Sequence, residues 1–187
     1  YQMIAGRGIC DNVIYMNPNN GYKITEFIED SRVCDIENVN DLELCMEKLQ
    51  EFHKMKLKVK HTFDIFRQID FYESLWGGQS SIYRDYTKTK ENIFSLREYV
   101  DAHKEEYCLT HIDAVPDNFL FTSDGNVRLI DWEYAAMQDP HVDIAMFCVY
   151  AMYDRTQVDR LIDIYFNGNC RSEVRIKIYC YIMEQLV

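Results

Sequence analysis

The chain opens with two segments in which apolar and polar side chains alternate, as in a half-buried β-strand. Residues 12–16 are rich in β-formers, and residues 22–28 alternate polar and apolar positions. The residues between them, Asn17-Pro18-Asn19-Asn20-Gly21, are strong turn formers. This pattern predicts an antiparallel hairpin.

From Asp41 onward the apolar positions recur every three or four residues, the period of one helical face. The first helix is expected to have Asn40 or Asp41 as its N-cap. A second spans residues 63–76 and stops at Gly77-Gly78, and a third spans residues 93–103. The apolar face of the first helix consists of Leu42, Cys45, Leu49, Phe52 and Met55.

Short β-like pieces follow at residues 107–110, 119–122 and 127–130, and a Ser-Asp-Gly-Asn turn joins the last two as a hairpin. After Pro140 the helical period returns, over residues 142–153, 157–166 and 173–187. The order of hairpin, helices, small β insert and helices predicts an α+β fold.

Composition narrows the class of protein. With 187 residues and 48% of them hydrophobic, the chain is long enough for one well-buried domain and is not a disordered sequence. Its formal net charge of −11 argues against a nucleic-acid-binding protein and is compatible with a cationic ligand. The seven cysteines are widely spaced without a CxxC pair, and neither a signal peptide nor a membrane-spanning run is visible. We therefore expect a cytoplasmic protein with reduced, mostly buried thiols and no membrane insertion.

The most informative motif is HIDAVPDN at residues 111–118, followed by Ile130-Asp131-Trp132-Glu133. The spacing H-x-D-x-x-x-x-N matches the catalytic-loop pattern of kinases. Phosphoryl transfer needs an aspartate near the attacking hydroxyl, and hard oxygen ligands for Mg²⁺. Asp113 fits the first role, and Asn118 and Asp131 fit the second, although each residue taken alone also fits an ordinary turn or strand end.

Three further residues are candidates for supporting roles. His111 is expected to hold the loop backbone by hydrogen bonds. Asp143 follows Pro140 in the first turn of a helix, where the helix dipole favours a carboxylate. A sharper interpretation is that Asp143 supports the loop by accepting backbone N–H bonds. Glu133 either contacts the metal through water or faces solvent.

The segments LTHIDAVPDNFLF, VRLIDWEYA and DPHVDIAMF occur in an order and spacing that resemble the aminoglycoside-phosphotransferase and choline-kinase superfamily, whose fold is protein-kinase-like. Within it, GYKITEFIED, LQEFHKMKLKVKHTFDIF and LIDWEYAAMQDPHVDIAMF are most similar to bacterial choline kinases that feed phosphocholine to surface glycopolymers. The resemblance implies that residues 1–28 are the last hairpin and the hinge of an N-terminal lobe. Residues 29–187 would form a helical C-terminal catalytic lobe with the small β insert.

The resemblance also assigns roles. Asp113 would be the catalytic aspartate, with ATP as co-substrate and Mg²⁺ held by Asn118 and Asp131. Backbone groups of Glu26 and Ile28 would bind adenine. Two kinds of side chain complete the implied site: Arg32, which would approach the phosphates or the substrate, and the tyrosines Tyr134, Tyr150 and Tyr153, which would surround the ammonium group of choline.

The chain also departs from the family. Gly6-Arg7-Gly8 is too short for a phosphate-binding loop, Lys23 lies too close to the hinge to be the phosphate-binding lysine, and no tryptophan follows Trp132. We therefore expect a truncated piece, inactive by itself, of an ATP:choline phosphotransferase. Two alternatives stay open: transfer to ethanolamine, an aminoglycoside or another small alcohol, and a non-catalytic kinase-like binding module. The sequence leaves the oligomeric state undetermined.

Overall fold

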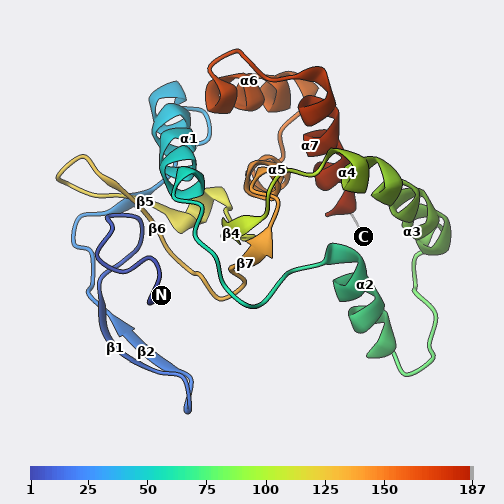
Figure 1. Ribbon diagram of the computed structural model, residues 1–187, viewed down its shortest axis with the longest axis horizontal. Helices are drawn as coiled ribbons and strands as arrows, with labels where there is room; N and C mark the ends of the chain where they lie inside the picture. Colours follow the sequence, from blue (N-terminus) through green and yellow to red (C-terminus); the bar gives the residue numbers. More distant parts are fainter. Residues whose placement is uncertain (186–187) are drawn as a thin grey trace.

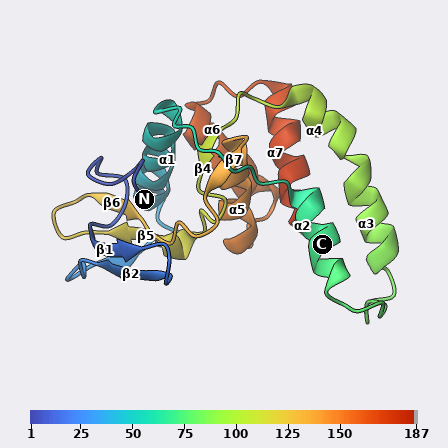
Figure 2. The ribbon, with the colours of Figure 1, turned by 60° about the horizontal axis from the view of Figure 1, so that its bottom comes forward.

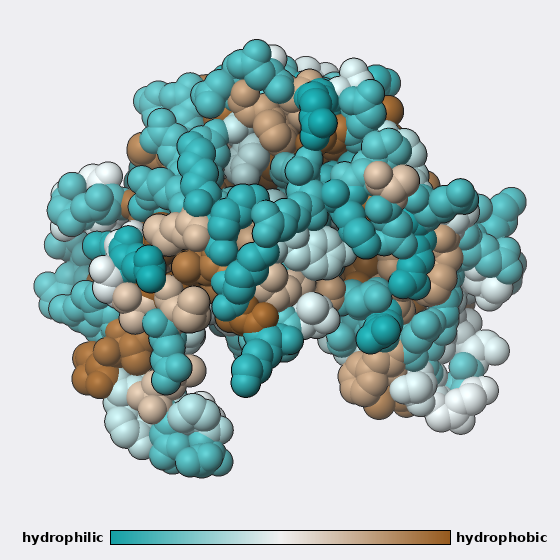
Figure 3. All heavy atoms as spheres, in the orientation of Figure 1, coloured by the Kyte–Doolittle hydropathy of each residue, from teal (hydrophilic) through white to brown (hydrophobic). Residues whose placement is uncertain are grey.

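The computed structural model describes residues 1–185. Its helices form an arc around a small β insert (Figure 1). A hairpin projects from one end of the arc and an arm made of α2 and α3 from the other (Figure 1). The surface is hollowed between them (Figure 3). Turning the molecule keeps the hairpin and the arm on opposite sides (Figure 2).

The strands are β1 (Val13–Asn17), β2 (Tyr22–Thr25), β3 (Arg32–Val33), β4 (Cys108–Thr110), β5 (Phe119–Phe121), β6 (Val127–Leu129) and β7 (Ala136–Gln138). The helices are α1 (Val39–Lys54), α2 (Ile65–Ser74), α3 (Tyr86–Ser95), α4 (Arg97–His103), α5 (His141–Tyr150), α6 (Arg155–Phe166) and α7 (Ser172–Glu184).

The predicted N-terminal hairpin is confirmed, since β1 and β2 pair antiparallel and Asn17 lies opposite Tyr22. The second strand ends at Thr25, however, so residues 26–28 lie outside the sheet. Apolar side chains on this hairpin are exposed, among them Ile14, Tyr22 and Ile24 (Figure 3). A two-stranded hairpin is only marginally stable by itself, so its position depends on what it packs against.

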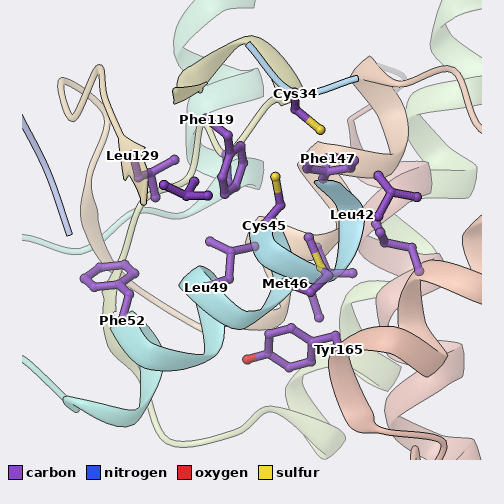
Figure 4. Packing of buried hydrophobic residues seen from close by; sticks show 14 of the residues in the cluster. Cys34, Leu42, Cys45, Met46, Leu49, Phe52, Phe119, Leu129, Phe147 and Tyr165 are labelled. Atoms are coloured by element: carbon purple, nitrogen blue, oxygen red, sulfur yellow. The ribbon is translucent and has the colours of Figure 1, made fainter. Parts of the chain in front are cut away.

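Helix α1 carries the predicted apolar face into the core. Figure 4 shows Cys45, Leu49 and Phe52 facing the β insert, with Phe119 and Leu129 opposite them. The N-cap is Asn38, whose side chain accepts a hydrogen bond from the amide of Asn40, and not Asn40 or Asp41 as predicted. The prediction was wrong because the Asp41 carboxylate is engaged elsewhere, by an arginine upstream.

The next two predicted helices are confirmed with corrections. Asp64 caps α2 by accepting the amides of Phe66 and Arg67, and the chain leaves the helix through Gly77 and Gly78, whose φ angles of +61° and +82° suit glycine. The single helix predicted over residues 93–103 is instead two helices, α3 and α4, on either side of Leu96.

The β insert consists of two small antiparallel sheets. Strands β5 and β6 form the predicted hairpin, with Phe119 opposite Leu129, and β3 joins the free side of β5. Strand β4 pairs with β7, so that Leu109 lies opposite Met137. The sequence did not indicate β3 or β7, because two or three residues are too few to show an alternating pattern.

Helix α5 is the centre of the helical part and is buried nearly all round. It ends at Tyr150, three residues earlier than predicted, and α7 begins one residue earlier than predicted and ends at Glu184. The predicted end of the last helix at residues 186–187 lies outside the described residues. Among the described residues every cysteine is a free thiol, six of them buried. Each helix the structure describes is too short or too polar to cross a membrane.

A buried ion pair fastens α7 to the start of α5. The Lys177 ammonium lies 2.7 Å from the Asp139 carboxylate, and both side chains are fully buried. Asp139 also accepts backbone hydrogen bonds from Glu105 and His141. Burial alone would raise the pKa of Asp139, but the hydrogen bonds and charges of His141 and Lys177 hold this pKa far below its ordinary value.

The first prediction concerns this anchor. Lys177→Met removes the cation and leaves a buried carboxylate without its partner, which costs about 3–5 kcal/mol of unfolding free energy. Urea unfolding followed by circular dichroism measures the loss. Lys58→Met, which breaks an exposed pair with Glu106, is the control and should leave the midpoint nearly unchanged. Equal midpoints for the two variants would contradict the anchoring role.

A second prediction follows from Glu184, which is buried at the end of α7 with one carboxyl oxygen unpartnered. Burial raises its pKa from the ordinary 4.5 to about 8. Between these values the folded chain holds a proton that the unfolded chain releases, so the free energy of unfolding falls as pH rises, by up to about 1.4 kcal/mol per pH unit. Glu184→Gln removes this contribution. Its advantage over the natural chain, measured by urea unfolding, should therefore grow from pH 5 to pH 8; parallel curves would rule the effect out.

Candidate active site

The loop that carries Asp113 is built between β4 and β5. Pro116 begins a single 3₁₀ turn, Pro116–Asn118, which leads directly into β5. Proline fits the first position of a helical turn because its fixed φ is already suitable and its missing N–H is not needed there. The turn brings Asn118 back to Asp113: its side-chain amide donates to the Asp113 carbonyl oxygen at 2.8 Å and to the Asp113 carboxylate at 3.2 Å.

The two acidic loops are joined at Ile130, the residue before Asp131. The Ile130 amide donates to the Asn118 carbonyl at 2.9 Å. The Ile130 carbonyl accepts from His111 Nε2 at 2.8 Å. The backbone next to Asp131 is therefore bonded to residues on both sides of Asp113, so the two loops converge.

His111 has the structural role that the sequence predicted. It is fully buried, and burial lowers the pKa of its imidazole, so that the ring is neutral. Its ring contacts Trp132 edge-on, with centroids 4.5 Å apart. Because Nε2 faces a carbonyl oxygen, this nitrogen carries the proton.

Both loops contain a residue with unfavourable backbone geometry. Ile112, directly before Asp113, has φ of +72°, and Asp131 has φ of +62°. A β-branched residue at positive φ is a genuine outlier, and such geometry costs about 1–3 kcal/mol and persists only where the surroundings hold it. No sequence pattern indicated this strain.

Asp143 supplies the support for the first loop. Its carboxylate is fully buried and accepts the backbone amides of His111 at 3.0 Å and Ile112 at 2.7 Å. These are the backbone hydrogen bonds that the sharper interpretation of Asp143 required. The same carboxylate contacts His53 of α1, a residue that sequence reasoning missed because it lies 90 positions away in the chain.

The electrostatics of the site favour a proton acceptor at Asp113. Its side chain is half-buried, and its pKa is raised, first by burial and further by the negative charges of Asp131 and Asp143. His111 and the Asn118 hydrogen bond oppose this effect. A carboxylate with a raised pKa binds a proton more readily than an ordinary one.

The oxygen ligands present fit Mg²⁺. Within residues 1–185 no three His, Cys, Asp or Glu side chains form a ready-made metal cluster. Mg²⁺ does not need one, because it takes one or two carboxylates and completes its shell with water and phosphate. The Asp131 carboxylate, which is exposed, and Asn118 Oδ1 have no hydrogen-bond or ion-pair partner among the described residues, so both are available.

A pocket of about 380 Å³ is lined by residues 26–28, the segment that the sequence predicts to be the hinge, and by Asp131. Its lining includes Glu26, Ile28, Lys23 and Asp131. Among the described residues, the Glu26 carbonyl and the Ile28 amide have no hydrogen-bond partner, whereas the Glu26 amide donates to Asn12. Lys23 thus lies at the same pocket as Asp131.

Arg32 has a structural partner within the chain. Its guanidinium makes a two-pronged contact with the buried Asp41 carboxylate, one bond being 2.9 Å long, and lies over the Phe121 ring at 4.4 Å. This pair ties β3 to α1. Arg32 lines neither pocket beside the hinge segment, and its expected ligand contact stays a prediction.

The three candidate tyrosines differ in their surroundings. Tyr134 is half-exposed and follows Asp131 by three residues, and its pKa is raised by the charge of Glu133 first, with Asp113 and Asp131 contributing. Glu133 itself is exposed, and so is Tyr150. Tyr153 lies beyond α5, partly buried against the core, and its hydroxyl donates to the Ile36 carbonyl at 2.7 Å. Tyr153 is thus packed against the core with its hydroxyl already bonded, which favours a structural role over a contact with substrate.

Comparison with known proteins places this geometry in a family. The model of the phosphotransferase enzyme family matches residues 42–179. Protein LicA of Haemophilus influenzae is 26% identical over 156 residues, which cover 81% of this chain and 58% of that protein. The choline kinase LicA from Streptococcus pneumoniae superposes with a TM-score of 0.85 at 25% identity, over 98% of this chain and 65% of that one. A choline/ethanolamine kinase family protein from Mesorhizobium loti superposes with a TM-score of 0.81 at 22% identity, over 93% of this chain and 61% of that one.

The chain therefore spans about three fifths of the length of the relatives it matches. The α+β, kinase-like fold expected from the sequence is confirmed by these superpositions. The family match covers both acidic loops, Asp143 and most of the helical part. The chain belongs to the phosphotransferase enzyme family.

Proposed function

We propose that the whole protein transfers the γ-phosphoryl group of ATP to the hydroxyl group of a small cationic alcohol, with choline as the acceptor. The observation that carries this proposal is the convergence of the Asp113 and Asp131 loops through the two hydrogen bonds of Ile130. Phosphoryl transfer depends on positioning and on charge neutralisation, and both are served by acidic and amide oxygens gathered at one place.

The nucleotide would lie in the pocket between the hinge segment and Asp131. An adenine edge presents an amine donor beside a ring-nitrogen acceptor. The unpartnered Glu26 carbonyl and Ile28 amide, two residues apart on one wall, complement that edge. The phosphates would then extend toward Asp131, which lines the same pocket together with Lys23.

Asn118 and Asp131 are the residues that would hold Mg²⁺. When bound, the ion supplies charge neutralisation at the phosphate oxygens. Asn118 serves both parts of the site: its amide nitrogen fixes Asp113, and its amide oxygen stays free. Asp113 would orient the acceptor hydroxyl and take its proton as the phosphoryl group moves. The raised pKa of Asp113 favours this step.

Choline is proposed as the acceptor for two reasons. The most similar structure reported above is that of a choline kinase. Tyr134, three residues after Asp131, also has a half-exposed ring, which would contact a quaternary ammonium group. Such a cation–π contact contributes about 0.5–2 kcal/mol. The Mesorhizobium relative, named for choline or ethanolamine, keeps ethanolamine as the second candidate.

Two further parts of the proposal concern the whole protein. Residues 1–28 would belong to a nucleotide-binding lobe, since the exposed apolar side chains of β1 and β2 suit packing against additional structure. Residues 29–187 would form the catalytic lobe, with the protein acting in the cytoplasm on ATP and choline. The intact Asp113, Asn118 and Asp131 set favours catalysis over a binding-only module.

The third prediction tests Asp113. In the full-length protein, Asp113→Asn should lower kcat by about 10²–10⁴-fold, because the side chain keeps its shape but loses its proton acceptor. The rate of ADP release with Mg-ATP and choline gives the result. Asp117→Asn, on the exposed side of the same turn, is the control and should retain the natural rate. If Asp113→Asn turned over normally, Asp113 would have no part in the chemistry.

The fourth prediction tests the acceptor. Choline should have a higher kcat/KM than ethanolamine, and Tyr134→Ala should raise the KM for choline by about 2–30-fold, which corresponds to about 0.5–2 kcal/mol. Tyr134→Phe keeps the ring and should keep the KM within about twofold. A KM for choline that is the same in all three proteins would exclude Tyr134 from the site. A higher kcat/KM for ethanolamine would make ethanolamine, and not choline, the acceptor.

A further inference from the structure

A row of buried polar side chains runs from α6 through α1 to the Asp113 loop. The Tyr165 hydroxyl lies 2.8 Å from His53 Nδ1, and His53 Nε2 lies 2.9 Å from Asp143 Oδ2. Each of the three side chains is at least nine-tenths buried. None of these three side chains belongs to an acidic loop. The row nevertheless ends on the Asp143 carboxylate, which holds the loop that carries Asp113.

The hydrogen-bond roles in this row follow from chemistry. An ionised carboxylate only accepts hydrogen bonds, so His53 Nε2 carries a proton and donates a hydrogen bond to Asp143. With that proton on Nε2, His53 Nδ1 accepts a hydrogen bond, and the Tyr165 hydroxyl donates it. Burial raises the pKa of Tyr165 far above its ordinary value, which keeps that proton in place. This one assignment satisfies every group in the row.

The effect of the row is to fix the orientation of the Asp143 carboxylate. Oδ2 is shared by His53 Nε2 and the His111 amide, and Oδ1 accepts the Ile112 amide. The positive φ of Ile112 must be held from outside, because an isoleucine does not choose it. Any rotation of the carboxylate would release Ile112 and displace Asp113, its neighbour.

We propose that His53, oriented by Tyr165, is a positioning residue that sets the placement of Asp113 through Asp143. This proposal rests on the proposed function, because a role in placement is expressed in phosphoryl transfer. The competing explanation is that His53 is only a satisfied polar group in the core. In that case its loss would weaken the whole fold and would not act selectively on the loop.

The fifth prediction uses two substitutions at His53 in the full-length protein. His53→Leu is similar in size but has no donor, whereas His53→Gln places an amide N–H where Nε2 lies. His53→Leu should lower kcat at least tenfold with the KM for ATP within about twofold, because the nucleotide pocket is untouched. His53→Gln should recover kcat to within about threefold of the natural protein. Tyr165→Phe should lower kcat by a smaller factor than His53→Leu; no effect would remove Tyr165 from the proposal.

A second measurement does not depend on activity. Hydrogen–deuterium exchange should become at least tenfold faster in the peptide covering residues 108–115 of His53→Leu, relative to the peptides of α5 and α7. Leu42→Ala, which opens a cavity in α1 three turns away from His53, is the control for general destabilisation and should show no such selectivity. Uniform acceleration in His53→Leu, or an unchanged kcat in a folded variant, would overturn the proposal. If the natural protein transferred no phosphoryl group, the proposed function would fail, while the exchange result would still decide whether His53 holds the loop.

Discussion

The geometry of the site depends on one residue without a functional side chain, Ile130. Its amide and its carbonyl are bonded to Asn118 and to His111, which flank Asp113 on either side. Because β6 ends one residue earlier, at Leu129, both groups are free of strand pairing and available to the other loop. Two loops separated in sequence are thus held in register by main-chain atoms, and a side-chain substitution at position 130 would leave those bonds possible.

Two buried carboxylates at the start of α5 divide the support of this arrangement. Asp139 fastens α7 and the segment after α4, and Asp143 fastens α1 and the Asp113 loop. Each has enough donors to compensate for its lost hydration, and Asp143 lies in the first helical turn, where the dipole favours negative charge. The helix therefore serves as a rigid base that joins the stability of the fold to the placement of the site.

Sequence patterns predicted what is periodic or local and missed what is short or distant. The apolar face of α1 and the hairpin β5–β6 depend on residues close together in the chain, and both predictions were correct. Strands β3 and β7 are too short to show a period, and the break at Leu96 falls inside a continuous apolar pattern. The contact between His53 and Asp143 joins positions 90 apart. No local pattern carries such a pairing, and the strain at Ile112 likewise depends on its partners and not on its neighbours.

The closeness of several carboxylates makes the acidic site electrostatically unfavourable in the absence of a ligand. Burial raises the proton affinity of Asp113, the negative charges of Asp131 and Asp143 raise it further, and the described residues provide no cation in contact with Asp113 or Asp131. Charges of one sign gathered in a half-buried place are unfavourable unless a ligand compensates for them. A magnesium nucleotide and an alcohol that carries a positive charge would each bring such compensation, the metal at Asn118 and Asp131 and the ammonium group by Tyr134. The proposed reactants are therefore also the partners that would relieve the repulsion built into the fold.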